Sequence, residues 1–94
     1  MIKSFADEDT QALFSGQRPR HLPPSILRPA ARKLLIINAA SSLTDLAEPP
    51  GNRLEKLKGR RIGQHSIRVN DQWRICFEWR DGDAFKVEVT DYHS

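Results

Sequence analysis

The chain has little cysteine, no long apolar run and no apolar N-terminus. Cys76 is the single cysteine in 94 residues, so an intramolecular disulfide is excluded and no cysteine spacing suggests a metal site. No run of 18 apolar residues occurs, and the sequence therefore predicts no transmembrane helix and no membrane partner. The first nine residues turn acidic where a secretory signal would be apolar, so we expect a cytoplasmic protein.

Internal repeats, low-complexity tracts and long linkers are also absent from the sequence. Ninety-four residues are enough for one domain with one modest core, so we expect residues 1–94 to form a single domain. No helix-turn-helix pattern appears, which argues against a DNA-binding repressor.

The most informative stretch runs from residue 63 to residue 79, where apolar and polar side chains alternate. Trp73, Ile75, Phe77 and Trp79 occupy odd positions, and Arg74 stands among the polar even ones. Alternation with a period of two places successive side chains on opposite faces of a strand. We therefore expect one buried face with both tryptophans, and an opposite face with Arg74 in the middle of the strand.

Two turn signals divide this half of the chain into three strands. Residues 67–69 alternate in the same way, and residues 70–71, Asn-Asp, tolerate the backbone of a tight turn. A second turn is expected at residues 81–83. The alternation then resumes, and it predicts a buried face with Phe85, Val87 and Val89. The three strands form an antiparallel meander.

The N-terminal half carries helical patterns after a short strand at residues 2–5. Residues 7–14 predict a first helix, with acidic residues in its opening turn and Gly16 at its end. A second helix is predicted at about residues 25–40, because one apolar stripe contains Leu27, Ala30, Leu34 and Ile37. Pro29 either lies in the first turn of this helix or kinks it.

A further helical turn is expected at residues 41–46, capped by Ser41 or Ser42. Leu54 and Leu57 then return the chain to the core. The order is β-α-α-β-β-β, which predicts an α+β fold of two layers, with two helices packed on one face of an antiparallel sheet. The opposite face would remain open.

Positive charge is concentrated in the segment from Arg53 to Arg80. This segment of 28 residues contains eight basic and three acidic residues, so its net charge is +5, whereas that of the remainder is −2. Concentrated positive charge favours binding of an anionic polymer. Arg68 and Arg74 can share one face of the sheet, which favours a binding surface over a merely solvated one.

Three segments together resemble the HigB toxins of the RelE/ParE superfamily of bacterial toxin–antitoxin systems. They are residues 51–59, residues 70–77 and the terminal Asp91-Tyr92-His93. The resemblance covers essentially the whole chain. It implies the RelE-like fold, a ribosome-dependent endoribonuclease that cuts mRNA, and neutralisation by a HigA-type helix-turn-helix antitoxin. Operator DNA would be bound only through that antitoxin.

RNA is cleaved without metal or cofactor when its own 2′-OH attacks the adjacent phosphate. Arg74 is the expected phosphate cation, because a guanidinium is permanently charged and bonds two oxygens at once. Lys58 is the second expected cation. His93 is the first choice for proton transfer, while Asp91 orients it or acts as base and Tyr92 stacks on a nucleobase. The resemblance implies these same five positions in or around the active site.

Other polar residues are expected to contact RNA or the ribosome: Arg53, Lys56, Arg60, Arg61, Arg68 and Gln72. Strand parity raises one difficulty, because Asp91 and His93 share the parity of Val87 and Val89. The last strand must twist, bulge or end by about residue 90 for these two residues to reach the face of Arg74.

The chain departs from the HigB pattern in two places. Ala31 precedes Arg32 where many members carry a basic pair, and His65 stands where these toxins usually carry an aromatic residue. His65 has the parity of Ile67, so we interpret it as structural. An alternative function is a non-catalytic toxin of the same fold that blocks gyrase or ribosome assembly. Such a toxin would not need the residues of the 91–93 trio.

Overall fold

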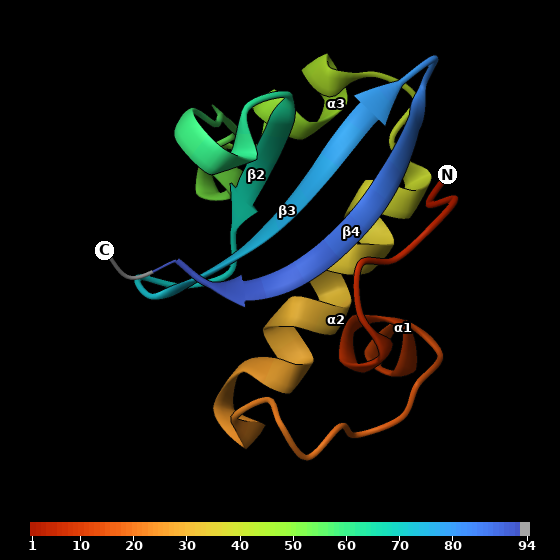
Figure 1. Cartoon of the computed structure of the whole chain (residues 1–94), viewed down its shortest axis with the longest axis vertical. Helices are drawn as coiled ribbons and strands as arrows, with labels where there is room; N and C mark the ends of the chain where they lie inside the picture. Colours follow the sequence, from red (N-terminus) through yellow and green to blue (C-terminus); the bar gives the residue numbers. More distant parts are fainter. Residues whose placement is uncertain (93–94) are drawn as a thin grey trace.

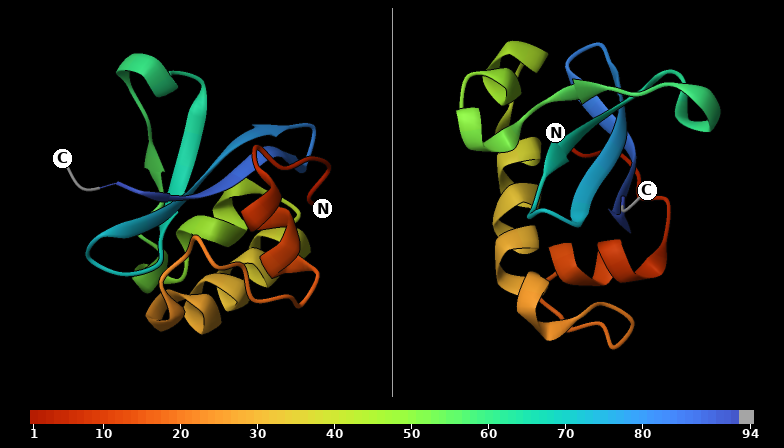
Figure 2. Two further views of the ribbon diagram at one scale, coloured as in Figure 1. Left: turned by 60° about the horizontal axis from the view of Figure 1, so that its bottom comes forward. Right: turned by 90° about the vertical axis from the view of Figure 1, so that its left-hand side faces the viewer.

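A computed structural model describes residues 1–92 of the chain. Figures 1 and 2 show the helices on one face of a twisted antiparallel sheet. The expected two-layer α+β fold is therefore confirmed. The elements are α1 (Glu8–Phe14), α2 (Pro24–Ala39), α3 (Leu43–Ala47), β1 (Glu55–Lys56), β2 (Gln64–Arg68), β3 (Trp73–Arg80) and β4 (Asp83–Asp91), with 3-10 turns η1 (Pro50–Asn52) and η2 (Gly59–Arg61).

The sheet has the strand order β1-β2-β3-β4, with each neighbouring pair antiparallel. The predicted meander corresponds to β2, β3 and β4. The short strand β1 and its hairpin with β2 were not predicted. The first segment is not a regular strand; Ile2 and Phe5 instead form isolated parallel bridges with Ala84 and Val87 of β4.

The helix ends follow from local capping. Asp7 precedes α1, and its carboxylate accepts a hydrogen bond from the Thr10 N–H at 2.7 Å. Ser42 caps α3 in a reciprocal arrangement with Asp45. Helix α2 begins at Pro24, so Pro29 lies inside it and removes the hydrogen bond that its N–H would donate to the Ser25 carbonyl. None of the helices described for residues 1–92 has the length and apolar character needed to span a bilayer.

The core lies between α2 and the concave face of the sheet. The predicted stripe of α2 is buried throughout, and it packs with Ile67, Ile75, Phe77, Val87 and Val89. Trp73 and Trp79 pack against this core but are only partly buried.

The second turn, between β3 and β4, is a two-residue loop in which Asp81 and Gly82 both have positive φ, 52° and 82°, as a type I′ hairpin requires.

The prediction for Phe85 is wrong, because β4 contains an irregularity that sequence alternation does not show. The register shifts between Cys76 and Glu78, and Lys86 has a φ of 53°. The bulge adds one residue to β4, so the residues of β4 before Lys86 face the opposite side to the one that strict alternation predicts. Ala84 is fully buried in the core, while Phe85 pairs with Glu78 on the open face and lies under the Arg80 guanidinium at 4.1 Å.

Candidate active site

The face of the sheet away from the helices carries a row of polar side chains. Arg68, Arg74 and Thr90 are directly opposite one another on β2, β3 and β4. No helix covers this face in the views of Figure 2. It is therefore the surface on which the sequence placed Arg74.

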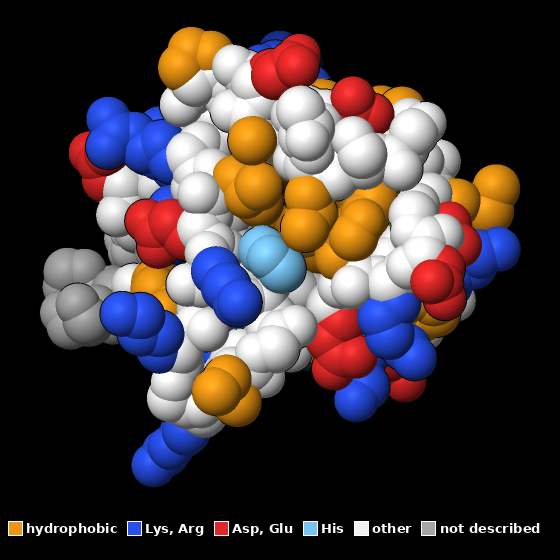
Figure 3. Space-filling view, turned by 90° about the horizontal axis from the view of Figure 1, so that it is seen from above, with side chains coloured by type: hydrophobic (Ala, Val, Ile, Leu, Met, Phe, Trp, Pro, Cys, Tyr) orange, Lys and Arg blue, Asp and Glu red, His pale blue; other side chains and the backbone are white. Residues whose placement is uncertain are grey.

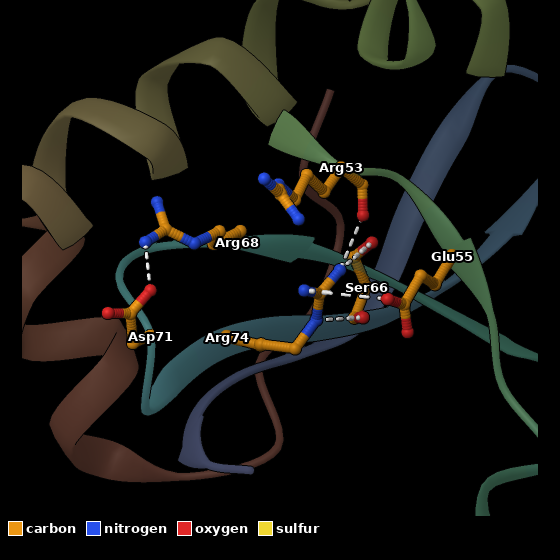
Figure 4. A network of polar contacts seen from close by, with 6 residues as sticks. All are labelled: Arg53, Glu55, Ser66, Arg68, Asp71 and Arg74. Carbon is orange, nitrogen blue, oxygen red and sulfur yellow. Dashed lines mark hydrogen bonds and ion pairs between the residues drawn. The ribbon is translucent and has the colours of Figure 1, made fainter. Parts of the chain in front are cut away.

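Arg74 is much less exposed than its place on the open face suggests, at 9%. Its Nε–H donates to Ser66 Oγ at 2.6 Å, and its Nη2 donates to the carbonyls of Arg53 at 2.5 Å and Ser66 at 3.2 Å (Figure 4). Nη1 faces the Glu55 carboxylate at 3.8 Å. The guanidinium is thus held rigidly in one orientation, and Nη1 presents the donors that remain for a ligand.

A pocket of about 280 Å³ opens beside this guanidinium. Its walls come from β1, the β2–β3 turn, β3 and the end of β4. The lining residues are Arg53, Glu55, Arg68, Asn70, Asp71, Gln72, Arg74 and Tyr92. Three arginines and one aromatic ring on these walls are suited to a phosphate with an attached base.

The turn between β2 and β3 is ordered by its own side chains. Asn70 Oδ1 accepts from the N–H groups of Gln72 at 2.8 Å and Trp73 at 2.7 Å. Arg68 donates to the Asp71 carboxylate at 2.5 Å, and this hydrogen bond and charge lower the pKa of Asp71. Asp71 therefore stays ionised and partly neutralises Arg68 at the rim of the pocket.

Arg53 occupies a strained position for a residue with a side chain. Its φ of 44° and ψ of 57° are left-handed, a conformation that costs about 1 kcal/mol or more outside glycine. Neighbouring contacts impose it: the buried side chain of Asn52 donates to the Leu46 carbonyl at 3.1 Å and accepts from Lys33, while the Arg53 carbonyl is clamped by Arg74. Arg53 is one of the residues that line the pocket.

Of the two described residues of the terminal trio, Asp91 and Tyr92, Tyr92 lines this pocket. It shares the parity of Thr90, and its N–H donates to the Gln72 carbonyl at 2.9 Å. Asp91 instead lies opposite Trp73, and its carboxylate accepts from Gln72 Nε2 at 2.9 Å. The bulge at Lys86 comes before Val87 and leaves the parity of Asp91 unchanged. His93 lies outside the described residues.

Lys58 does not line the pocket. It directly precedes η2 and follows Leu57, whose N–H donates to the Gln64 carbonyl. Gln64 is four residues along β2 from Arg68. At about 3.3 Å per residue this is roughly 13 Å along the strand. Arg60 is exposed on the same loop. Lys56 pairs with His65, which has the parity of the core, so Lys56 projects from the opposite face to Glu55.

Sequence reasoning missed Glu55 and Ser66. Both lie next to Arg74, and they face each other across β1 and β2. The register of the β2–β3 hairpin could have revealed Ser66, because it places Ser66 beside Arg74 once the turn at 70–71 is assigned. To find Glu55, the β1–β2 hairpin must be known, and residues 51–59 show no alternation that predicts it.

His65 is structural, as its parity predicted. Its ring stacks on Phe77, with centroids 6.2 Å apart, and its Nδ1 is buried without a hydrogen-bond partner among the described residues. Figure 3 shows one side of the molecule, where apolar side chains gather in a patch with basic and acidic side chains around it. Burial, and then the charge of Lys56, lower the pKa of His65 below its ordinary value of 6.5.

This environment predicts a loss of stability in mild acid. The unfolded chain takes up a proton at His65 near pH 6.5, whereas the folded chain resists it until a lower pH, so the free energy of unfolding falls between those two values. Urea unfolding at pH 7.5 and pH 5.5 measures this difference. His65→Phe, which keeps the ring stack, should reduce the difference; an unchanged pH dependence would show that other groups cause it.

Among residues 1–92, no three His, Cys, Asp or Glu side chains gather as a set of metal ligands. A known family matches almost the whole chain. Residues 3–93 match the model of the RelE-like toxin HigB of type II toxin–antitoxin systems. The chain belongs to the HigB-like toxin family.

Two HigB relatives extend over almost the whole chain. Toxin HigB-1 of Vibrio cholerae serotype O1 is 50% identical over 88 residues, which cover 93% of each chain. Endoribonuclease HigB of Proteus vulgaris is 33% identical over 93 residues, covering 99% of this chain and 100% of that protein.

Solved RelE-like toxins support the fold of this HigB-like chain. The YoeB-YefM complex from Staphylococcus aureus matches with a TM-score of 0.60 at 19% identity, covering 100% of this chain and 99% of that one. A YafQ mutant from E. coli matches with a TM-score of 0.57 at 16% identity, covering 98% and 94%. At these identities the likeness concerns the architecture alone.

Proposed function

We propose that this HigB-like toxin is an endoribonuclease that cleaves mRNA on the ribosome and thereby inhibits translation and growth. The observation that supports this most is the pocket beside Arg74, where a fixed guanidinium, two further arginines and Tyr92 meet on the open face of the sheet. The relative from Proteus vulgaris is named an endoribonuclease.

The reaction requires only groups of the RNA and of the protein. The 2′-OH gives its proton to a base and its oxygen attacks phosphorus, while the bond from phosphorus to the 5′-oxygen breaks. An acid gives a proton to the departing 5′-oxygen, so the products carry a 2′,3′-cyclic phosphate and a 5′-OH. Arg74 Nη1 stabilises the charge that gathers on the phosphate, and the 2′-OH requirement explains why DNA is spared.

Proton transfer is assigned to the C-terminal trio. Tyr92 lines the pocket, where its ring can stack on the nucleobase. His93 is the proposed acid or base, and Asp91 orients it. Lys58, at the far end of the open face from Tyr92, would contact the phosphate backbone of an extended RNA strand.

The ribosome supplies what the pocket lacks. It holds mRNA in the A site in a defined orientation, which lowers the entropy cost of bringing the 2′-OH in line. Arg53, Arg60 and Arg68 are the proposed contacts to RNA or the ribosome. A HigA-type helix-turn-helix antitoxin would neutralise the toxin and bind operator DNA, and the cytoplasm is where all these partners occur.

Primer extension on translated mRNA tests this function. Wild-type protein added to translating ribosomes should produce discrete breaks within codons, with 2′,3′-cyclic phosphate on the upstream fragments. The alternative is a non-catalytic toxin that blocks gyrase or ribosome assembly. Growth inhibition with intact mRNA in this assay would favour that alternative and contradict the nuclease.

His93→Gln should lower the cleavage rate by about 100-fold or more, the usual contribution of a positioned acid or base. Gln bonds like histidine but does not titrate near neutral pH. A chain that ends at Tyr92 is the second variant. Both should keep the melting temperature and the antitoxin binding of wild type, as measured by thermal unfolding and calorimetry. Cleavage at the wild-type rate by the shortened chain would reject His93 as a catalytic residue.

A further inference from the structure

The loop between β1 and β2 is tied to the far side of the sheet by Arg61. Arg61 Nη1 donates to Gln64 Oε1 and to Glu88 Oε1, each at 3.0 Å. Glu88 belongs to β4, so the contact crosses β2 and β3 over the open face. The two side chains are 29% and 28% exposed, which shields this pair better than most surface ion pairs.

The pair is strong enough to leave an electrostatic signature. Burial acts to lower the pKa of Arg61, but the hydrogen bond to Glu88 and the charge of that carboxylate outweigh it, and the pKa is raised. Arg61 is thus committed to an internal partner, which argues against its expected role as an RNA contact.

The loop itself is built to move if this tie is removed. Gly59 and Gly63 bound it with φ values of 64° and 90°, and a Cβ at either would meet no atom within 4 Å. Ile62 is 79% exposed. Among the polar contacts described for residues 58–63, the Arg61–Glu88 pair is the one that reaches β4. Figure 2 shows this loop projecting from the side of the sheet away from the helices.

Lys58 is mechanically connected to Arg61. It stands directly before η2, and the Arg61 N–H donates to the Lys58 carbonyl at 3.3 Å. A rotation of the turn about its glycines would therefore move Lys58 relative to the pocket at Arg74.

We propose that the Arg61–Glu88 pair is a positioning device that fixes the β1–β2 loop, and with it Lys58, relative to the cleavage pocket. This inference rests on the proposed nuclease function. Arg61 and Glu88 are positioning residues: they act through Lys58 and not through contact with RNA.

The direction in which the cleavage rate changes after loss of the Glu88 carboxylate distinguishes a positioning role from a purely electrostatic one. Removing the Glu88 carboxylate makes the open face more positive, which strengthens binding of an anionic polymer. A charge-only role for Glu88 therefore predicts equal or faster cleavage after its removal. The positioning role predicts slower cleavage, because the loop loses its partner on β4.

The experiment compares Glu88→Ala with Glu78→Ala in the ribosome-dependent cleavage assay. Glu78 is a matched control, since it also lies on the open face, is 28% exposed and pairs with a basic residue, Lys86, at 3.4 Å. We expect Glu88→Ala to slow cleavage about tenfold and Glu78→Ala to leave it within about twofold. Glu88→Gln loses the same charge but keeps an acceptor for Arg61, and should recover most of the rate.

A double-mutant cycle identifies the residue through which the pair acts. In a Lys58→Ala background, Glu88→Ala should change the rate by less than about twofold, because the group that it positions is gone. Hydrogen exchange should be faster at the amides of residues 59–63 in Glu88→Ala, and unchanged in β3.

Two results would overturn the proposal: wild-type or faster cleavage by Glu88→Ala, or the same tenfold loss in the Lys58→Ala background. If wild type itself cleaves no mRNA, the nuclease function fails and the positioning role fails with it. Wild-type hydrogen exchange in the loop of Glu88→Ala would further show that the pair does not hold the loop.

Discussion

Arg74→Ala is expected to lower the rate of mRNA cleavage by about 100- to 1000-fold, the range measured when one donor to a developing negative charge is removed. Nη1 of Arg74 faces the pocket, while Nε and Nη2 are occupied by Ser66 and Arg53. The variant should also be less stable by about 1–3 kcal/mol, because buried hydrogen-bond acceptors lose their donor. Single-turnover cleavage and urea unfolding measure the two effects.

The structural cost corrects an expectation from the sequence. From strand parity alone, Arg74 lies away from the core, and removal of its side chain would leave the fold intact. The side chain is nevertheless 9% exposed and joins the start of β1 to β2 and β3. The Arg53 backbone, which is strained, depends on this contact.

Ser66→Ala separates activity from stability at this site. It removes the oxygen that accepts from Nε but leaves the charge of Arg74 and its contacts with two carbonyls. We expect a smaller loss of activity, about tenfold or less, with the fold retained. Arg74→Lys keeps the charge but cannot bond several acceptors at once, so it should behave more like Arg74→Ala. Full activity in a folded Arg74→Ala protein would remove Arg74 from the active site.

Much of the fold was predictable because its hydrophobic patterns are strong and local. The stripe of α2 and the odd positions of β3 needed only periodicities of 3.6 and 2 to be assigned to the core. The turn at 81–83 followed from residues that accept positive φ. The turn at 70–71 followed from Asn-Asp, and there it is the Asn70 side chain that orders the backbone by accepting hydrogen bonds. Two predictions failed: the regular strand at 2–5, where isolated bridges to β4 form instead, and the core position of Phe85, which a register shift between β3 and β4 reverses.

The candidate site was predicted less completely, because it is assembled from contacts between distant segments. Alternation places Arg74 on the open face but says nothing of the carbonyl of Arg53, which caps it from 21 residues away. The same limit applies to Glu55, whose strand has only two residues. Tyr92 reaches the pocket through the ordinary parity of β4, which the concern about parity did not affect. Asp91, which it did affect, keeps the parity of Val89 and lies opposite Trp73.

The largest expected loss of stability comes from Phe77→Ala. Phe77 is fully buried at the centre of the sheet, between the rings of His65 and Trp79. Truncation of a buried aromatic costs about 3–5 kcal/mol, a large part of the 5–15 kcal/mol that holds a typical domain together. We expect a protein that is unfolded or degraded at 37 °C, and inactive for that reason. Trp73→Ala should cost less than Phe77→Ala, because Trp73 is only partly buried.

Phe85→Ala is the matched control for this prediction. It removes the same atoms from the neighbouring strand, but the irregularity at Lys86 has turned Phe85 to the open face, where it contacts Arg80. The loss should therefore be about 1 kcal/mol, the scale of an exposed cation–π contact and a surface strand position. Urea unfolding of the two variants measures the difference directly. If Phe85→Ala destabilises the protein as much as Phe77→Ala, strict alternation holds through β4 and the irregularity is absent. A large difference between the two supports the irregularity at Lys86, which places Ala84 in the core and Phe85 on the open face.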